Sequence, residues 1–431
     1  MRWALFLMAA LFASDAAADG FRALAGHGGP IHDVAISQDG RLALTASFDN
    51  SVGVWDLDND SVRWLDGHEA AVKAVSFAGP GRVASAGDDF EIAIWDIDSG
   101  TRLHRLSGHA GQIKDLALSP DQTRLASASW DGTVGLWDIE TGARIAQLRG
   151  HEGAVNDVVF LDAATLITAS ADGTIRTWNM DGSQRRILVR HGFGVTCLLV
   201  NARAGWLIYG ATDGGTRVID LATDAVLADL TLDRRPVLDI AATPDFSQVA
   251  VGDGEGHIMV VNTANWDIVH DFRAALRGPV WALAYTADGQ SLLTGGIDDQ
   301  AYFWPVGAKD EGPLLANAER GFLKAPETMT NGERQFRRKC SICHSLTHDG
   351  IRRAGPSLAG LFGRRAGSYP GYAYSDSVAG AGITWNAATI DALFDQGPEH
   401  YMPGTKMPMQ RITKPRDRAD LIAFLREHTK G

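Results

Sequence analysis

A motif that recurs every 40 to 42 residues constrains the first three hundred residues more than any other feature. Four Gly-His dipeptides are each followed, about thirty residues later, by a tryptophan, namely Trp55, Trp95, Trp137 and Trp178. Two weaker copies carry Ile219 and Val261 at the tryptophan place, and Trp304 restores the pattern. A fixed period of this length marks a structural unit that packs against its own copies. The sequence therefore predicts seven such units.

Each copy has the pattern of four short strands. The third copy, "IKDLALSPDQTRLASASWDGTVGLWDIETGARIAQL", alternates apolar runs with Pro-Asp, Asp-Gly and Thr-Gly turn signals. A four-stranded sheet cannot bury both faces alone, so the copies are expected to pack around an axis. Over about residues 21–306 the chain resembles the WD-repeat family, which implies an all-β, seven-bladed propeller over residues 19–306. The last copy stops after its third strand, so we expect Phe21 to Leu24 to complete it.

Repeated polar residues in the copies could be mistaken for a catalytic relay. In the third copy these are His109, Ser127 or Ser129, Asp131 and Trp137. The same set recurs in neighbouring copies, which a unique active site would not do. The WD-repeat resemblance implies a structural hydrogen-bond network inside each blade, because buried polar groups need partners. The propeller is then a surface for docking other proteins.

The stretch "RRKCSICHSL" uses two of the three cysteines of the chain. The spacing Cys340-x-x-Cys343-His344 is the attachment signature of a c-type haem. Two thiols add to the porphyrin vinyl groups, and the imidazole becomes the proximal iron ligand. A thioredoxin-like motif needs no histidine, and a zinc site needs a further ligand pair. Cys197 lies in the apolar run "VTCLLV", which indicates a buried strand residue. We therefore expect one covalent haem c.

The last hundred residues read as a separate helical domain. Residues 307–329 lack strand alternation and read as a linker, and Thr330 to Glu333 match the capping box that starts a helix. From residue 330 to 431 the chain resembles class I c-type cytochromes of the mitochondrial type. The resemblance rests on "NGERQF", "CSICHSL", "AGPSLAGLFGRRAG", "YPGYAYSDS", "GITW", "YMPGTKMPM" and "RADLIAFLREHT". It implies a small all-α cytochrome domain after the propeller.

The resemblance also implies roles for single residues. His344 and Met407 would ligate the iron, a pairing that raises the reduction potential and suits an electron carrier. The carbonyl of Pro356 would orient the His344 ring. The groups that would contact the haem propionates are Arg364, Tyr374 and Trp385.

Three other residues could supply the sixth iron ligand. Met402 and Met409 are read as packing residues, and His400 as a surface residue, so Met407 is the preferred ligand. The chain also departs from its relatives: Leu393 stands where they place a tyrosine near the axial sulfur. Val378 replaces an asparagine of their buried polar network.

The first 18 residues read as a secretory signal peptide. Arg2 precedes an apolar run from Trp3 to Ala13, and Ala16 to Ala18 supply an A-x-A cleavage site. An uncleaved anchor is the alternative, and no other stretch resembles a membrane span. Because thioether attachment in bacteria takes place outside the inner membrane, we expect a soluble protein of the Gram-negative periplasm.

The charges of the two parts are opposite. Residues 321–431 carry 16 Lys and Arg against 10 Asp and Glu, a balance of +6, whereas residues 1–320 carry 24 against 42, a balance of −18. The acidic part is a poor match for nucleic acid. The resemblance places Lys339, Lys406 and Lys414 on the haem-edge face, which would dock redox proteins. A face of the propeller would be a second docking surface for them.

Three functions fit these features. The first is a periplasmic electron carrier whose propeller is a docking scaffold. The alternatives are a fused oxidoreductase, whose propeller holds a substrate or second cofactor, and a redox-sensing assembly scaffold. The sequence shows a complete carrier site and no second catalytic constellation, which favours electron transfer over substrate turnover.

Overall fold

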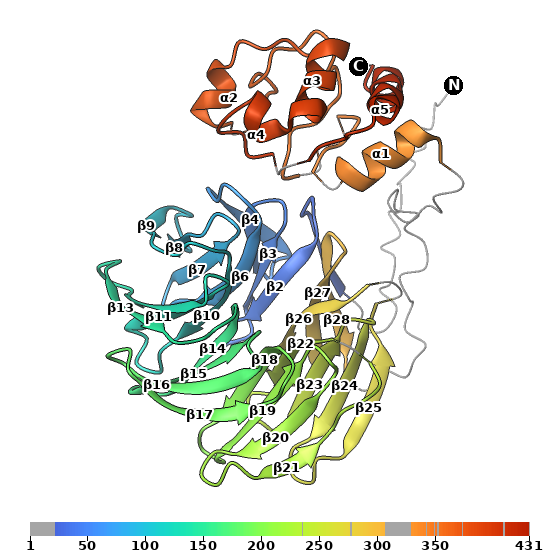
Figure 1. The fold of residues 1–431 in the computed structure, drawn as a ribbon. Coiled ribbons are helices and arrows are strands. Elements are labelled where there is room, and N and C mark those ends of the chain that lie inside the picture. The colour runs from blue at the N-terminus through green and yellow to red at the C-terminus, as the bar shows by residue number, and fades with distance from the viewer. Residues whose placement is uncertain are drawn as a thin grey trace, which may run out of the picture.

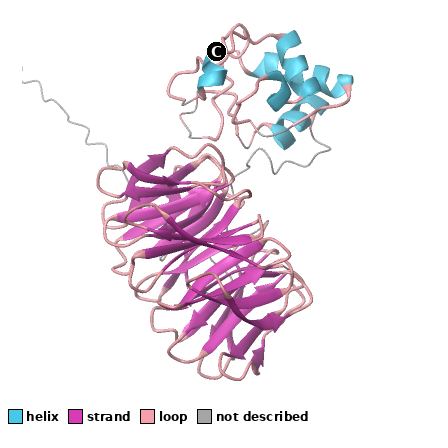
Figure 2. Ribbon diagram, turned by 60° about the vertical axis from the view of Figure 1, so that its left-hand side comes forward, coloured by secondary structure: helices cyan, strands magenta, loops and turns pink. Residues whose placement is uncertain are grey.

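The protein has two parts, a ring of seven β-sheets and a small helical domain (Figures 1 and 2). The computed structural model describes residues 22–306 except 235, 276 and 277, and residues 329–430 except 342, 349, 351, 352, 373, 408 and 409. This architecture confirms the predicted fold class. The expected signal peptide and all but the last residue of the expected linker lie outside the described residues.

Each blade is a four-stranded antiparallel sheet in which consecutive strands pair. Blades 1 to 4 consist of β2 Ile31–Ile36, β3 Leu42–Ser47, β4 Ser51–Asp56, β5 Ser61–Asp66; β6 Val72–Phe77, β7 Arg82–Gly87, β8 Ile92–Asp96, β9 Arg102–Leu106; β10 Ile113–Leu118, β11 Arg124–Ser129, β12 Thr133–Asp138, β13 Arg144–Arg149; β14 Val155–Asp162, β15 Thr165–Ser170, β16 Thr174–Asn179 and β17 Gln184–Arg190. Blades 5 and 6 consist of β18 Val195–Asn201, β19 Trp206–Ala211, β20 Thr216–Asp220, β21 Val226–Asp229; β22 Val237–Ala242, β23 Gln248–Asp253, β24 His257–Asn262 and β25 Ile268–Arg273.

Blade 7 is built from both ends of the propeller sequence. Its three inner strands are β26 Val280–Tyr285, β27 Ser291–Gly296 and β28 Gln300–Pro305, and its outer strand is β1 Arg22–Ala25. In the β1–β28 pair, Leu24 lies opposite Ala301. The expectation that the N-terminal segment completes the last blade is therefore confirmed, and Phe21 lies outside the described residues.

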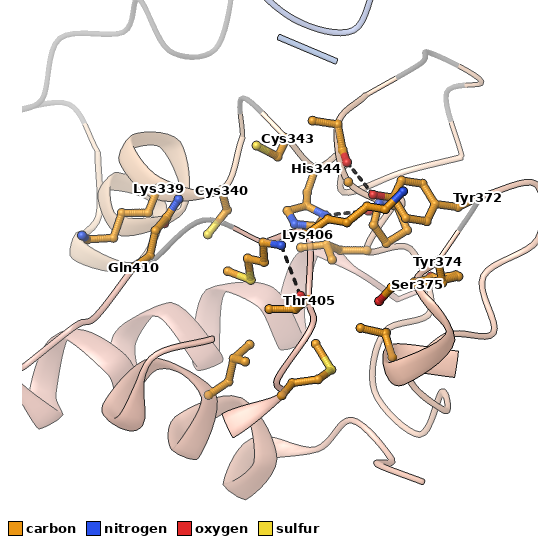
Figure 3. Close-up of a pocket in the computed structure, with 18 of the residues that line it drawn as sticks. Lys339, Cys340, Cys343, His344, Tyr372, Tyr374, Ser375, Thr405, Lys406 and Gln410 are labelled. Carbon is orange, nitrogen blue, oxygen red and sulfur yellow. Dashed lines mark hydrogen bonds between the residues drawn. The ribbon is translucent and has the colours of Figure 1, made fainter. Parts of the chain in front are cut away.

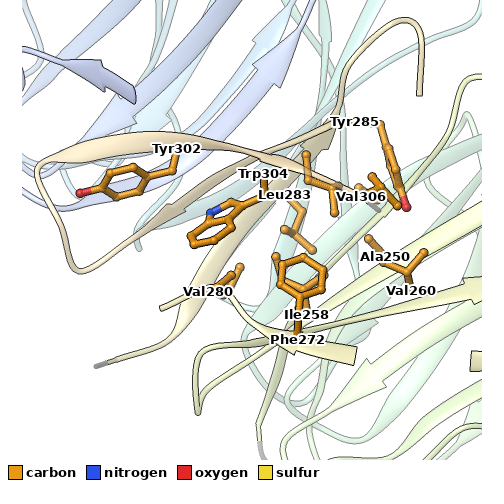
Figure 4. Close-up of a cluster of buried hydrophobic side chains, with 13 residues drawn as sticks. Ala250, Ile258, Val260, Phe272, Val280, Leu283, Tyr285, Tyr302, Trp304 and Val306 are labelled. Atoms are coloured by element: carbon orange, nitrogen blue, oxygen red, sulfur yellow. The ribbon is translucent and has the colours of Figure 1, made fainter. Parts of the chain in front are cut away.

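The hydrophobic core lies between neighbouring blades. Figure 4 shows one such cluster, in which Ile258 and Phe272 of blade 6 meet Val280, Leu283 and Trp304 of blade 7. A blade on its own would leave these side chains in water, so each sheet is stabilised by the next one around the ring.

The repeated polar residues form the expected network inside the blades. In blade 3 the indole N–H of Trp137 donates to Ser127 Oγ at 2.9 Å, and this hydroxyl contacts His109 Nε2 at 2.8 Å. The His109 Nδ1–H donates to Asp131 at 2.8 Å. Ser129 instead bonds the carbonyl of Gly111. Blades 1, 2 and 4 repeat the network around Thr45, Ser85 and Thr168.

Half-buried aspartates on the innermost strands join one blade to the next. Each accepts a hydrogen bond of 2.6 to 2.9 Å from a backbone N–H of the following blade: Asp33 from Val75, Asp115 from Val158, Asp157 from Leu198 and Asp239 from Leu283. Cys197 occupies the same strand position in blade 5, after the same register shift. It is 2 % exposed, which confirms its reading as a buried strand residue.

The helical domain is held by the crossing of its first and last helices (Figure 1). A Cβ on Gly332 would lie 2.2 Å from the carbonyl oxygen of Asp420, so only glycine permits this approach. Phe336 of the first helix and Leu421 and Leu425 of the last share one buried cluster. The helices are α1 Asn331–Lys339, α2 Asp376–Gly380, α3 Ala387–Gln396, α4 Pro398–Tyr401 and α5 Pro415–His428.

Candidate haem site

The end of α1 positions the two thiols and the imidazole. Thr330 caps the helix by accepting from the backbone N–H of Glu333, and Cys340 is the C-cap. The backbone N–H groups of Cys343 and His344 both donate to the carbonyl of Cys340, at 3.0 and 2.8 Å. This tight turn directs all three side chains to the same cavity. Burial raises the pKa of Cys340 to about 12 and that of Cys343 to about 11, so both are neutral thiols.

The His344 ring is fixed in the orientation that an iron ligand requires. Its Nδ1–H donates to the carbonyl of Pro356 at 2.7 Å, which leaves Nε2 as the free nitrogen. Burial lowers the pKa of this imidazole and keeps it neutral, the form that binds metals. A Cβ on Gly355 would lie 2.3 Å from His344 Cε1, so the backbone of this glycine packs directly against the ring.

A cavity of about 490 Å³ lies in front of these residues (Figure 3). Met407 lines it together with Cys340, Cys343 and His344, and the apolar side chains of Leu361, Ile390 and Phe394 complete the walls. The two departures from the family, Leu393 and Val378, are buried in the same walls.

The alternative ligands lie in different places. Met402 also lines the cavity, but it is buried in a small cluster with Ala366 and Val378. His400 is exposed on α4. Met409 lies outside the described residues. Met407 stays the predicted sixth ligand, with Met402 as the other described thioether at the cavity.

Arg364, Tyr374 and Trp385 line the cavity as a group. The guanidinium of Arg364 donates to the carbonyls of Ala359 and Ser357, at 2.7 and 2.8 Å, and lies over the Tyr369 ring. Among the described residues, Arg364 contacts these carbonyls and this ring and no carboxylate. A cation held in this way can accept an anionic propionate.

Sequence reasoning missed several lining residues. Tyr372 donates to the carbonyl of Ala354 at 2.5 Å and packs edge-on against Tyr374. Its place in "YPGYAY", two residues before Tyr374, was a usable signal. Gln410 lines the cavity near Lys339 (Figure 3). Propeller loops contribute Phe48, Asn50, Ala70, Ala71 and Asp88, for which local sequence gives no signal.

The three predicted docking lysines do not all lie at the cavity. Lys339 and Lys406 line it, whereas Lys414 is the exposed residue that precedes α5. The haem-edge face is therefore basic at the cavity itself.

These residues fit a covalent haem c. Two neutral thiols on one turn, a neutral imidazole with a free Nε2, a thioether and apolar walls are the groups that such a cofactor requires. Cys340 and Cys343 are both free of disulfide bonds. The fold and this site together define the class of the protein, a c-type haem protein with a β-propeller.

Comparisons with known proteins agree with this class. The family model "Cytochrome c" matches residues 329–429. The chain is similar to cytochrome c of Gibberella zeae, 44% identical over 101 residues, which cover 23% of this chain and 92% of that protein. It is 42% identical to cytochrome c of Sesamum indicum over 105 residues, 24% of this chain and 93% of that protein. The chain belongs to the cytochrome c family.

The propeller also matches a family model. "WD domain, G-beta repeat" matches residues 21–56, 59–96, 100–138, 142–179 and 266–305. The matched segments leave out blade 5 and the first three strands of blade 6. In this unmatched part, His191 still bonds an aspartate, Asp213, but its second partner is the Tyr209 hydroxyl and not a serine or threonine. Arg234 pairs with Asp253. The protein is therefore an electron-transfer haem protein that carries a WD-repeat propeller.

No helix within the described parts of the chain has both the length and the apolar character needed to cross a bilayer.

Proposed function

We propose that the protein carries single electrons through one haem, bound covalently by Cys340 and Cys343 and ligated by His344 and Met407. The observation that carries this proposal is that all four side chains line one cavity, with the His344 ring oriented by Pro356. The bound iron supplies a one-electron couple, and the thioether of Met407 favours its reduced form. Apolar walls exclude water from the site, which also raises the potential.

We further propose that the protein works in the periplasm and that the propeller is a protein-docking scaffold. The segment up to Ala18 has the features of a cleaved signal peptide, and covalent haem attachment fits export. The partners would be redox proteins that recognise the basic haem edge and the propeller face. Among the described residues, no group of three or more His, Cys, Asp or Glu side chains is placed so that it could hold a metal ion.

The test is the intact mass and cofactor inventory of full-length protein matured in a bacterial periplasm. We expect a chain that lacks the first 18 residues and carries the mass of one haem, with one iron and no other metal. Replacing Met407 by Ala should keep the covalent haem and lower the reduction potential, because the thioether that favours Fe(II) is lost. A second bound cofactor or metal would instead support the fused oxidoreductase. A chain without covalent haem would overturn the proposal.

A further inference from the structure

The haem cavity is lined by both parts of the chain. Its propeller residues come from three connections: the β3–β4 turn with Phe48 and Asn50, the β5–β6 connection with Ala70 and Ala71, and the β7–β8 turn with Asp88. Because strand direction alternates within each blade, all three connections lie at the same end of the ring. Figures 1 and 2 show the helical domain beside the propeller.

We propose that this end of blades 1 and 2 is an intramolecular docking surface that covers the basic haem edge of the same chain. The proposal rests on the proposed function, since it concerns access to a bound haem. The occupant of the lysine face is then the propeller itself, and an external redox protein must compete with it.

The charges at the cavity support this pairing. The cytochrome side presents Lys339 and Lys406, both half-buried, and the propeller side presents Asp88. Asp88 Oδ2 lies 3.7 Å from Lys73 Nζ of the propeller. The Asp88 carboxylate and the two lysine ammonium groups line the same cavity, and charges of opposite sign attract each other across it.

The charge of the whole molecule acts in the same direction. The part up to residue 320 carries −18 and the remainder +6, so the two domains attract each other before contact. The short connection between them places the partners at an effective concentration on the order of millimolar. Weak contacts are enough to keep the domains together under these conditions.

The small size of Ala70 and Ala71 supports a close approach of the two surfaces. Phe48 adds an aromatic side chain to the same patch. The patch therefore combines an apolar centre with one carboxylate, which suits the apolar haem edge and its flanking lysines.

The experiment measures the radius of gyration of full-length holoprotein by small-angle scattering, at about 0.01 M and about 1 M salt. If the two domains dock, we expect a radius of gyration of ~22 Å at low salt, the value for one compact body of this length, and a larger radius at high salt. Asp88→Lys and Ala70→Lys should each shift the low-salt radius to the larger value. Ala70→Lys leaves the Lys73 and Asp88 pair intact, so it separates undocking from local damage.

The matched control is Asp98→Lys. Asp98 lies in the β8–β9 turn of the same blade, exposed at the opposite end of the ring, and the charge change is the same as in Asp88→Lys. The control should keep the compact radius. Equal radii for all variants at both salt concentrations would overturn the dock. Covalent haem, measured on the same samples, tests the proposed function separately. A chain without haem would contradict the proposed electron-carrier function even if its two domains dock.

Discussion

At the scale of single residues, Gly355 and Pro356 act on the same imidazole from neighbouring positions. Pro356 accepts the Nδ1–H of His344, and the Gly355 backbone packs against the ring edge. The orientation of the His344 ring, the proposed iron ligand, is therefore set by two consecutive residues. The resemblance predicted the role of Pro356, but the role of Gly355 follows only from atomic positions.

Replacing Gly355 by Ala should displace the His344 ring, because the new Cβ would lie 2.3 Å from Cε1. We expect the cytochrome domain to lose about 1–3 kcal/mol of stability, as in other overpacked sites. The measurement is denaturant unfolding followed by haem absorbance. Gly380→Ala is the matched control, since nothing lies within 4 Å of its Cβ position. Equal stability of the two variants would contradict the packing role.

Ser127 has a comparable role in blade 3. Ser127→Ala leaves Trp137 Nε1 and His109 Nε2 without their shared partner, at a cost of about 1–3 kcal/mol for a buried unsatisfied group. Thermal unfolding of the propeller measures this loss. Ser127→Thr should retain most of the stability, because blades 1 and 4 use Thr45 and Thr168 at this place. If Ala and Thr behave alike, the hydroxyl does not hold the network.

At the scale of elements, blade 7 closes the ring with its four strands, β1, β26, β27 and β28. Leu24 of β1 is 3 % exposed and packs with Ile31, Val34 and Phe303. The seam between blades 7 and 1 therefore has a hydrophobic core formed by both blades, and the N-terminal strand β1 contributes to it as part of blade 7.

Leu24→Ala should destabilise the propeller by about 2–5 kcal/mol, because it leaves a cavity in this seam. Leu103→Ala is the control with the same chemical change, since Leu103 on β9 is 42 % exposed. Chemical denaturation of full-length protein measures both. A loss as small for Leu24 as for Leu103 would show that the seam does not stabilise the ring.

Local pattern predicted the elements more completely than the contacts between them. The period and the turn signals were enough for seven blades, since each blade repeats the same local chemistry. They left the choice between Ser127 and Ser129 open, because both are polar, buried and two residues apart on one strand face. The cavity residues Phe48 and Asp88 lie more than 250 positions from Cys340, so no local pattern indicates that they meet.

At the scale of the whole molecule, the aspartates that join the blades make the propeller sensitive to pH. Burial raises the pKa of Asp33, Asp115 and Asp157, and that of Asp239 to about 7. The folded chain then holds protons that the unfolded chain releases. The stability from Asp239 is complete below its unfolded pKa of 3.8 and is lost as the pH rises through about 7.

Asp239→Asn should therefore flatten the fall in the free energy of unfolding between pH 5 and 7, a fall on the order of a few kcal/mol in the wild type. The measurement is calorimetry across that range. Asp245→Asn is the control, because its exposed carboxyl has a pKa lowered to about 2 by hydrogen bonds from Ser247 and Thr243 and does not titrate there. Identical slopes for wild type and Asp239→Asn would contradict the prediction.

The pairing of β1 with β28 also sets an order of folding. Leu24 lies opposite Ala301, 277 positions further along the chain. During synthesis from the N-terminus, β1 must wait until the last propeller strand has been made, and closing so long a loop carries a large entropy cost. Once made, β28 is an open edge that can pair with another chain until β1 pairs with it. Cys340 follows Pro305 by only 35 residues, so the haem-attachment turn is synthesised shortly after the strand that β1 must meet.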